Sequence, residues 1–96
     1  MPYARKIVLQ TRPGHESRLD TLVPAWMKDG VAFVGVVGPD CARVEDLIDE
    51  LVNGDGSRDY NLLTSSHPGE SLEQAIAFAQ SLQLEFSGTD VQVLEL

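Results

Sequence analysis

Apolar runs of strand length alternate with segments of helical periodicity along the chain. We expect strands at residues 4–10 (ARKIVLQ), 31–37 (VAFVGVV), 60–64 (YNLLT) and 91–96 (VQVLEL). The second run is apolar at nearly every position, which is typical of a strand that is covered on both faces. The last run alternates in part, with Gln92 and Glu95 pointing outward, and this pattern favours an edge strand.

Three helices are expected between these strands, over residues 15–28, about 41–53 and 72–84. Asp40 is placed to cap the second helix and Gly54 to end it. The apolar positions that fall on the inner side are Leu19, Leu22, Val23, Trp26 and Met27 in the first helix, Val44, Leu47, Ile48, Leu51 and Val52 in the second, and Leu72, Ala75, Ile76, Ala79 and Leu82 in the third.

Two local signals refine these helices. Ser71 and Gln74 have the S-x-x-Q spacing of a capping box, which predicts the start of the third helix. Pro24 falls inside the first helix, where proline removes a backbone hydrogen bond and clashes with the preceding turn. We therefore expect a kink there, or two short helices.

The resulting order βαβαβαβ predicts one α/β domain over residues 1–96, a three-layer sandwich around a four-stranded, mostly parallel sheet. Such a domain is flavodoxin-like or equivalent to half of a Rossmann fold. Strand orders 2-1-3-4 and 3-2-1-4 both fit, and the apolar second strand favours 3-2-1-4, where it is interior. In the other order this strand lies at an edge and offers a dimerisation surface.

The net charge of −8 is concentrated in the second half of the chain. Residues 1–43 hold six Lys/Arg and four Asp/Glu, whereas residues 44–96 hold one Arg and eleven Asp/Glu. An acidic surface repels phosphate backbones and anionic lipids, so we expect no nucleic-acid or membrane binding. With one cysteine and no recognisable export signal, the expected location is the cytoplasm.

Candidate chemistry gathers where the first three strands end, because ligands of parallel sheets bind outside the carboxyl ends of the strands. The loops expected there are residues 11–17, 38–43 and 64–71. As ligand-binding residues for a small anion such as phosphate or carboxylate we select Arg12, His15, Asp40, Ser65, Ser66 and Glu70. Turn formation and helix capping explain the stretch TSSHPGES more economically.

Cys41 and His67 form the candidate catalytic pair. Cys41 would lie at the start of a helix, where the helix dipole and a nearby imidazolium favour the thiolate. The pair requires strand order 3-2-1-4, which makes the second and third strands neighbours. In the competing interpretation Cys41 is a small buried apolar residue and His67 belongs to a turn.

No metal site and no cofactor are expected. His15, His67, Cys41 and either Asp40 or Glu16 share one rim but lack the close paired spacing of a zinc site. The segment 53–59 (NGDGSRD) resembles the beginning of a calcium loop, yet it lacks the required glycine and the final glutamate, so a polar turn is the better interpretation.

The second helix carries an acidic face of Glu45, Asp46, Asp49 and Glu50. These residues form two like-charge pairs four positions apart, and such pairs destabilise a helix slightly. The face either keeps a small protein soluble or docks a basic patch of a partner.

The stretches FVGVVGPDC, LIDELVNGDGS and TSSHPGESLEQAIAFA, within residues 31–80, resemble an uncharacterised family of short bacterial α/β proteins. That resemblance implies no activity. The sequence also lacks the acidic residues of phosphorelay receivers, the early phosphate loop of flavodoxins and the Cys-x-x-Cys motif of thioredoxins.

These observations favour a non-catalytic interaction or regulatory module that binds a protein partner or forms a homodimer. The alternative is an enzyme or small-anion binder that uses the rim residues, with Cys41 as nucleophile and His67 as base.

Overall fold

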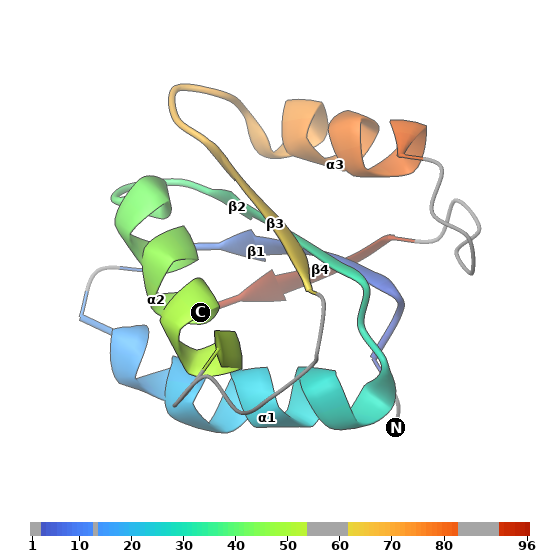
Figure 1. Cartoon of the computed structure of the whole chain (residues 1–96). Helices are drawn as coiled ribbons and strands as arrows, with labels where there is room; N and C mark the ends of the chain where they lie inside the picture. The colour runs from blue at the N-terminus through green and yellow to red at the C-terminus, as the bar shows by residue number, and fades with distance from the viewer. Residues whose placement is uncertain (1–2, 13, 54–61, 83–90) are drawn as a thin grey trace.

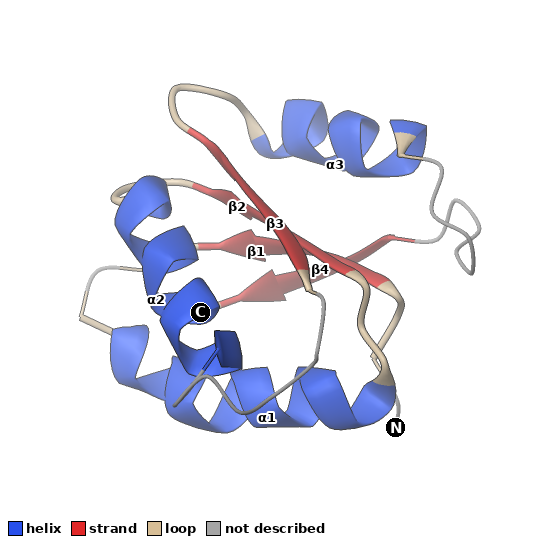
Figure 2. Ribbon diagram, viewed as in Figure 1, coloured by secondary structure: helices blue, strands red, loops and turns tan. Residues whose placement is uncertain are grey.

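The computed structural model describes residues 3–12, 14–53, 62–82 and 91–96. Its elements are β1 (Lys6–Gln10), a 3-10 turn η1 (Glu16–Arg18), α1 (Leu19–Asp29), β2 (Phe33–Val37), α2 (Cys41–Asn53), β3 (Leu63–His67), α3 (Leu72–Ser81) and β4 (Val91–Glu95) (Figures 1 and 2). The alternation of strands and helices confirms the predicted α/β fold. The calcium-loop-like segment after Asn53 and the expected helix stop at Gly54 lie outside the described residues.

All strand pairs of the sheet are parallel, in the order β3-β2-β1-β4. This is the order that the apolar second strand favoured, and every residue of β2 is buried. Because β2 lies between β1 and β3, it offers no edge for dimerisation. The two edges belong to β3 and β4, as expected for β4.

The described elements form three layers, with the sheet between two layers of helices (Figure 1). Helices α1 and α2 cover one face, where Ile7, Leu9, Val34 and Val36 of the strands join the larger apolar core. Helix α3 covers the other face, where a smaller cluster holds Val8, Phe33, Val37, Ala75 and Ala79. None of the described helices is long and apolar enough to span a membrane.

Several predicted boundaries are corrected. Helix α1 continues through Pro24 from Leu19 to Asp29, so it is not divided into two short helices there. Helix α3 has the predicted capping box of Ser71 and Gln74 but ends at Ser81. Asp40 precedes α2, and its carbonyl accepts a hydrogen bond from Val44 N at 3.0 Å. Its φ of 56°, however, differs from the extended backbone of an ordinary N-cap.

The third strand is also displaced. It was predicted at residues 60–64 and lies at Leu63–His67, so the hydroxyl and imidazole residues assigned to a loop belong to a strand. A strand sends alternate side chains to opposite faces of the sheet. This displacement decides which candidate residues meet.

Candidate functional site

Cys41 and His67 lie on opposite faces of the sheet. Cys41 is 3% exposed and belongs to the core beneath α1 and α2. His67 packs its ring edge-on against Phe78 of α3, with 5.0 Å between ring centroids. Although β2 and β3 are neighbours as the hypothesis required, the sheet separates the two side chains. The proposed cysteine–histidine pair is therefore not assembled.

His67 instead joins two residues of its own segment. Ser65 Oγ lies 2.7 Å from His67 Nε2, and His67 Nδ1 lies 3.2 Å from Glu70 Oε2. Ser65 and His67 are two positions apart in β3 and therefore share the α3 face. Glu70 returns to the imidazole because the turn at Pro68 and Gly69 reverses the chain, with Glu70 N donating to His67 O at 3.2 Å.

Gly35 makes room for this arrangement. It is the partner of Ser65 in the parallel register of β2 and β3. A Cβ atom at position 35 would meet the Phe33 ring at 3.0 Å and His67 Nε2 at 3.4 Å. The missing side chain thus allows an aromatic ring and an imidazole to occupy the space beside Ser65. The histidine side chain is only 5% exposed, whereas that of Glu70 is 42% exposed.

The hydrogen-bond order fixes the roles of the two imidazole nitrogens. An ionised carboxylate can only accept, so the neutral imidazole carries its proton on Nδ1 and donates it to Glu70. Nε2 then presents a lone pair, and the Ser65 hydroxyl donates to it. A hydroxyl, an imidazole and a carboxylate connected in this order can activate the hydroxyl as a nucleophile.

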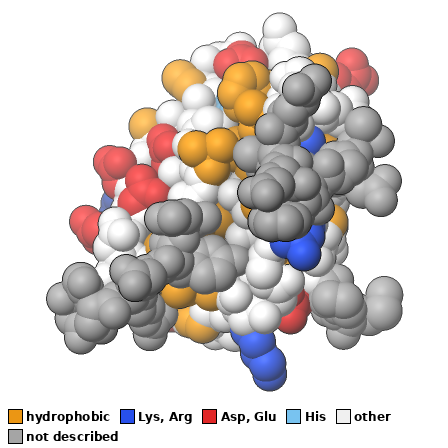
Figure 3. All heavy atoms as spheres, turned by 45° about the vertical axis from the view of Figure 1, so that its right-hand side comes forward, with side chains coloured by type: hydrophobic (Ala, Val, Ile, Leu, Met, Phe, Trp, Pro, Cys, Tyr) orange, Lys and Arg blue, Asp and Glu red, His pale blue; other side chains and the backbone are white. Residues whose placement is uncertain are grey.

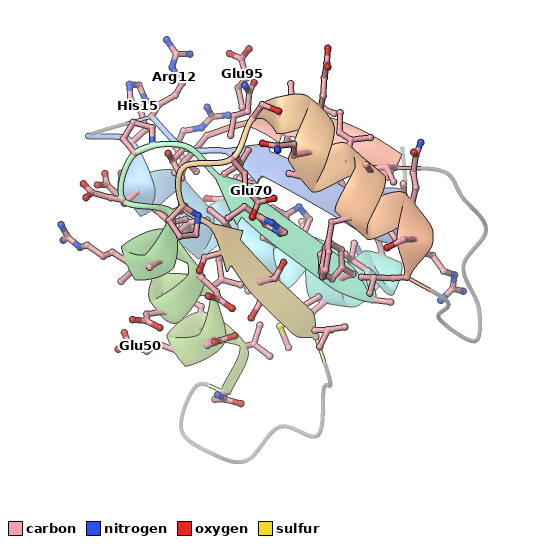
Figure 4. The ribbon with its side chains drawn as sticks, turned by 90° about the horizontal axis from the view of Figure 1, so that it is seen from above. Arg12, His15, Glu50, Glu70 and Glu95 are labelled. Carbon is pink, nitrogen blue, oxygen red and sulfur yellow. The ribbon has the colours of Figure 1, made fainter. Side chains whose placement is uncertain are left out.

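The remaining rim residues are distributed along the same end of the sheet but do not converge on this group. Arg12 Nη1 faces Glu95 Oε2 of the neighbouring edge strand at 3.6 Å, and both side chains are exposed. Figure 4 shows Arg12, His15 and Glu95 together, apart from Glu50 on α2. The predicted anion site, with Arg12 as counter-charge for residues 64–66, is not assembled. Among the described residues, no three His, Cys, Asp or Glu are grouped so that they could hold a metal ion.

The loop after β2 is shaped by Thr11 rather than by a ligand-binding residue. Thr11 Oγ1 donates to Pro39 O at 2.6 Å, and Thr11 N donates to Val37 O at 2.9 Å. Gly38 has φ of +112°, and a Cβ there would lie 2.6 Å from Thr11 Oγ1. Asp40, which follows this turn, is exposed.

The opposite face of β3 meets the acidic helix. Thr64 Oγ1 lies 3.0 Å from Glu45 Oε2 and 2.9 Å from Asp49 Oδ1. The hydroxyl has one proton, so it donates to one of these carboxylates at a time. Ser66 lies two positions after Thr64 in β3 and therefore turns toward the same face, away from Ser65 and His67. Asp46 and Glu50 lie exposed on the outer side of α2.

Sequence reasoning selected Ser65, His67 and Glu70 but assigned them to different roles. Ser65 and His67 are two positions apart, and this spacing predicts a shared face only if both residues belong to a strand. Sequence reasoning missed Thr64 as a partner of the acidic helix. It also missed Leu63 of β3 and Phe78 of α3, which are 49% and 41% exposed.

No curated protein and no solved structure matches the chain. One sequence family, described as a domain of unknown function (DUF7684), matches residues 1–93. The match agrees with the expected resemblance to an uncharacterised family, and it extends over nearly the whole chain. The chain belongs to the DUF7684 family.

Proposed function

We propose that this protein is an interaction module that binds an extended, basic segment of a protein partner along the free edge of β3. The observation that carries the proposal is the position of this strand. Among the described residues, β3 pairs with β2 alone, which leaves one row of its backbone groups without a strand partner. An exposed strand edge is a ready template for another extended chain.

The backbone geometry identifies the groups that a partner would meet. Leu63 N donates to Ala32 O at 3.0 Å, so the backbone of Leu63 points into the sheet. In a parallel strand the next residue points the opposite way. The N–H and C=O groups of Thr64 and Ser66 therefore face the free edge, where an added strand would bond to them.

The side chains on the two faces of β3 favour an alternating partner. On the α2 face lie Glu45 and Asp49, which would attract lysine or arginine. On the α3 face lie Leu63 and Phe78, which would pack against apolar side chains. Figure 3 shows acidic side chains gathered along one side of the molecule and apolar side chains exposed beside them.

Charge makes a second copy of this chain a poorer partner. Pairing β3 with β3 about a twofold axis perpendicular to the sheet keeps each helical layer on its own face. The acidic faces of the two α2 helices would then approach each other, and like charges in close proximity disfavour association. A heterologous basic segment meets no such repulsion.

The test uses a heptapeptide of alternating lysine and valine with blocked ends, titrated into ¹⁵N-labelled protein and followed by NMR. We expect the largest amide shifts at Thr64 and Ser66, and weaker binding as salt is added. A peptide of alternating glutamate and valine is the matched control and should leave these amides unchanged.

One substitution isolates the strand edge. Ser66→Pro removes an outward N–H that β2 does not use, so the ladder between β2 and β3 remains. It should weaken the lysine–valine peptide about tenfold or more, since a backbone hydrogen bond and close approach are lost, whereas Ser66→Ala should bind normally. Equal binding by the two variants, shifts confined to another surface, or a stable dimer by analytical ultracentrifugation would each contradict the proposal.

A further inference from the structure

We propose that Ser65, His67 and Glu70 form a nucleophilic serine site that accepts acyl groups from small, uncharged apolar esters. The site lies on the α3 face of β3, so this inference does not rest on the binding of a partner at the strand edge. Neither the family match nor any similarity to a known enzyme assigns this chemistry.

The argument begins with connectivity. Nε2 of His67 receives the Ser65 hydroxyl at 2.7 Å and Nδ1 faces the Glu70 carboxylate at 3.2 Å, so each nitrogen has a different partner. This is the order in which a base removes a hydroxyl proton while a carboxylate orients the ring and stabilises the imidazolium. All three residues come from one strand and the turn after it, so their relative positions depend on few long-range contacts.

The surroundings of Ser65 indicate the substrate class. His67 is buried against Phe78, and Leu63 lies on the same face of β3 two residues before Ser65. Leu63 and Phe78 are both substantially exposed, which leaves apolar surface for an acyl or aryl group. The chain has a net charge of −8, and Glu70 lies at the site, so anionic esters are disfavoured.

A donor for the developing oxyanion comes from the backbone. The N–H of Ser66 belongs to the residue after the nucleophile and points toward the free edge rather than toward β2, as the alternation from Leu63 requires. Among the described residues no strand pairs with this N–H, so while the edge carries no partner strand it can donate to an ester oxygen that carries negative charge.

The acylation step follows from these groups. Ser65 Oγ attacks the ester carbonyl carbon while His67 Nε2 takes the hydroxyl proton, and the tetrahedral oxyanion collapses with cleavage of the bond to the alcohol oxygen. The imidazolium returns its proton to that oxygen, so an alcohol leaves and an acyl-serine remains. Water then attacks the acyl-serine by the same route, releasing a carboxylic acid and restoring the hydroxyl. Ser65 and His67 are the catalytic residues, and Glu70 is a positioning residue.

The first test labels the intact protein with an alkyl fluorophosphonate. Ser65 Oγ forms a bond to phosphorus, the phosphorus–fluorine bond breaks, and fluoride leaves as the hydroxyl proton passes to His67. We expect one adduct, which tandem mass spectrometry locates at Ser65. An unlabelled wild-type protein, or a label distributed over other serines, overturns the proposal without reference to any variant.

Matched variants then assign the roles through labelling and hydrolysis of p-nitrophenyl butyrate. Ser65→Ala should abolish the label, and His67→Gln should slow hydrolysis by about 100-fold, the contribution of a positioned base. Ser17→Ala, at an exposed serine of the turn η1 that belongs to no proposed site, should leave both rates unchanged.

The positioning role of Glu70 is tested through a kinetic quantity that a purely structural residue would not affect. In Glu70→Gln, kcat for p-nitrophenyl butyrate should fall while KM stays unchanged, because the carboxylate that stabilises the imidazolium formed during acylation is absent. Circular dichroism confirms that each variant is folded. If folded His67→Gln labels and hydrolyses at the wild-type rate, the hydrogen bonds among these residues serve only the fold and the proposal is wrong.

Discussion

Among the elements that the structure describes, two helices seal one face of the sheet, whereas α3 alone covers the other. Beneath α1 and α2 the contacts are almost wholly apolar, and Trp26, Ile48 and Leu9 are completely buried. Beneath α3 the apolar cluster is smaller, and polar side chains from β1 and β3 reach inside it. The comparison separates the part of the molecule that holds the fold from the part that is available for chemistry.

The polar residues under α3 are tolerated because each has a partner. Lys6 is fully buried, and its Nζ donates to Leu82 O at 2.6 Å, at the carboxyl end of α3, where free carbonyls favour a cation. His67 has Ser65 and Glu70. On the sealed face, by contrast, Trp26 Nε1 is buried without a hydrogen-bond partner in the described part of the chain. Stability there comes from packing rather than polar pairing.

The largest expected effect comes from matched truncations on the two faces. Ile48 of α2 is fully buried on the sealed face, whereas Ile76 of α3 is half-buried on the other. Ile48→Ala should lower the free energy of unfolding by about 2–5 kcal/mol through lost burial and a residual cavity. Ile76→Ala should cost about 1–2 kcal/mol, because its site is partly open and can collapse or hydrate.

Urea denaturation followed by circular dichroism measures both variants under the same conditions. A domain of this size has about 5–10 kcal/mol of stability, so Ile48→Ala can approach the limit of folding. If the two truncations have equal cost, α3 contributes to the core as much as α2 does, and the contrast between the faces is wrong.

A smaller effect is expected where β2 allows the histidine to approach Ser65. Gly35→Ala adds a methyl group 3.0 Å from the Phe33 ring and 3.4 Å from His67 Nε2. Crowding of a packed site should cost about 1–3 kcal/mol, and displacement of the imidazole should slow labelling of Ser65. Urea denaturation and the fluorophosphonate reaction measure the two consequences separately.

The control for this substitution is a double-mutant cycle with Phe33→Leu. The smaller side chain removes the ring atoms that the new methyl group meets, so the double variant should be more stable than the sum of the single effects indicates. Strictly additive effects would contradict a clash with Phe33 as the cause.

The strand order could be predicted from the sequence because the second strand is much more apolar than the other three. VAFVGVV has no polar side chain, and only an interior strand covered on both faces requires that composition. The bounds of β3 could not be predicted in the same way. An edge strand that is only partly buried can hold threonine, serine and histidine, so the apolar run at 60–64 predicted a strand about three residues too early.

The error in the bounds of β3 explains why the predicted contact between Cys41 and His67 was wrong. The correct strand order was necessary for Cys41 to meet His67, but the face on which each side chain lies decides the contact. Once residues 63–67 form a strand, Ser65 and His67 share one face and Thr64 and Ser66 the other. Glu70 reaches the imidazole through the turn geometry at Gly69, which composition alone does not specify.

The smallest expected change in stability concerns the acidic residues of α2 that contact β3. Strand β3 has these residues on one face and the proposed serine site on the other. Glu45 and Asp49 are four residues apart on α2 and share the single proton of the Thr64 hydroxyl. Asp49→Asn removes one of two like charges and introduces an amide donor, so it should raise the free energy of unfolding by a few tenths of a kcal/mol, about 0.5 at most. Added salt should reduce this gain, since it already screens the repulsion in the wild type.

Asp46→Asn is the matched control, because Asp46 forms the other like-charge pair with Glu50 but lies exposed. If the acidic face serves only solubility, the two substitutions should be equivalent in binding. If it docks a basic strand at β3, Asp49→Asn should weaken the lysine–valine peptide more than Asp46→Asn does, while it stabilises the fold. If Asp49→Asn is more stable than the wild type yet binds the peptide more weakly, the repulsion between Glu45 and Asp49 is retained for recognition. If Asp49→Asn and Asp46→Asn bind the peptide equally, solubility is the reason for the acidic face.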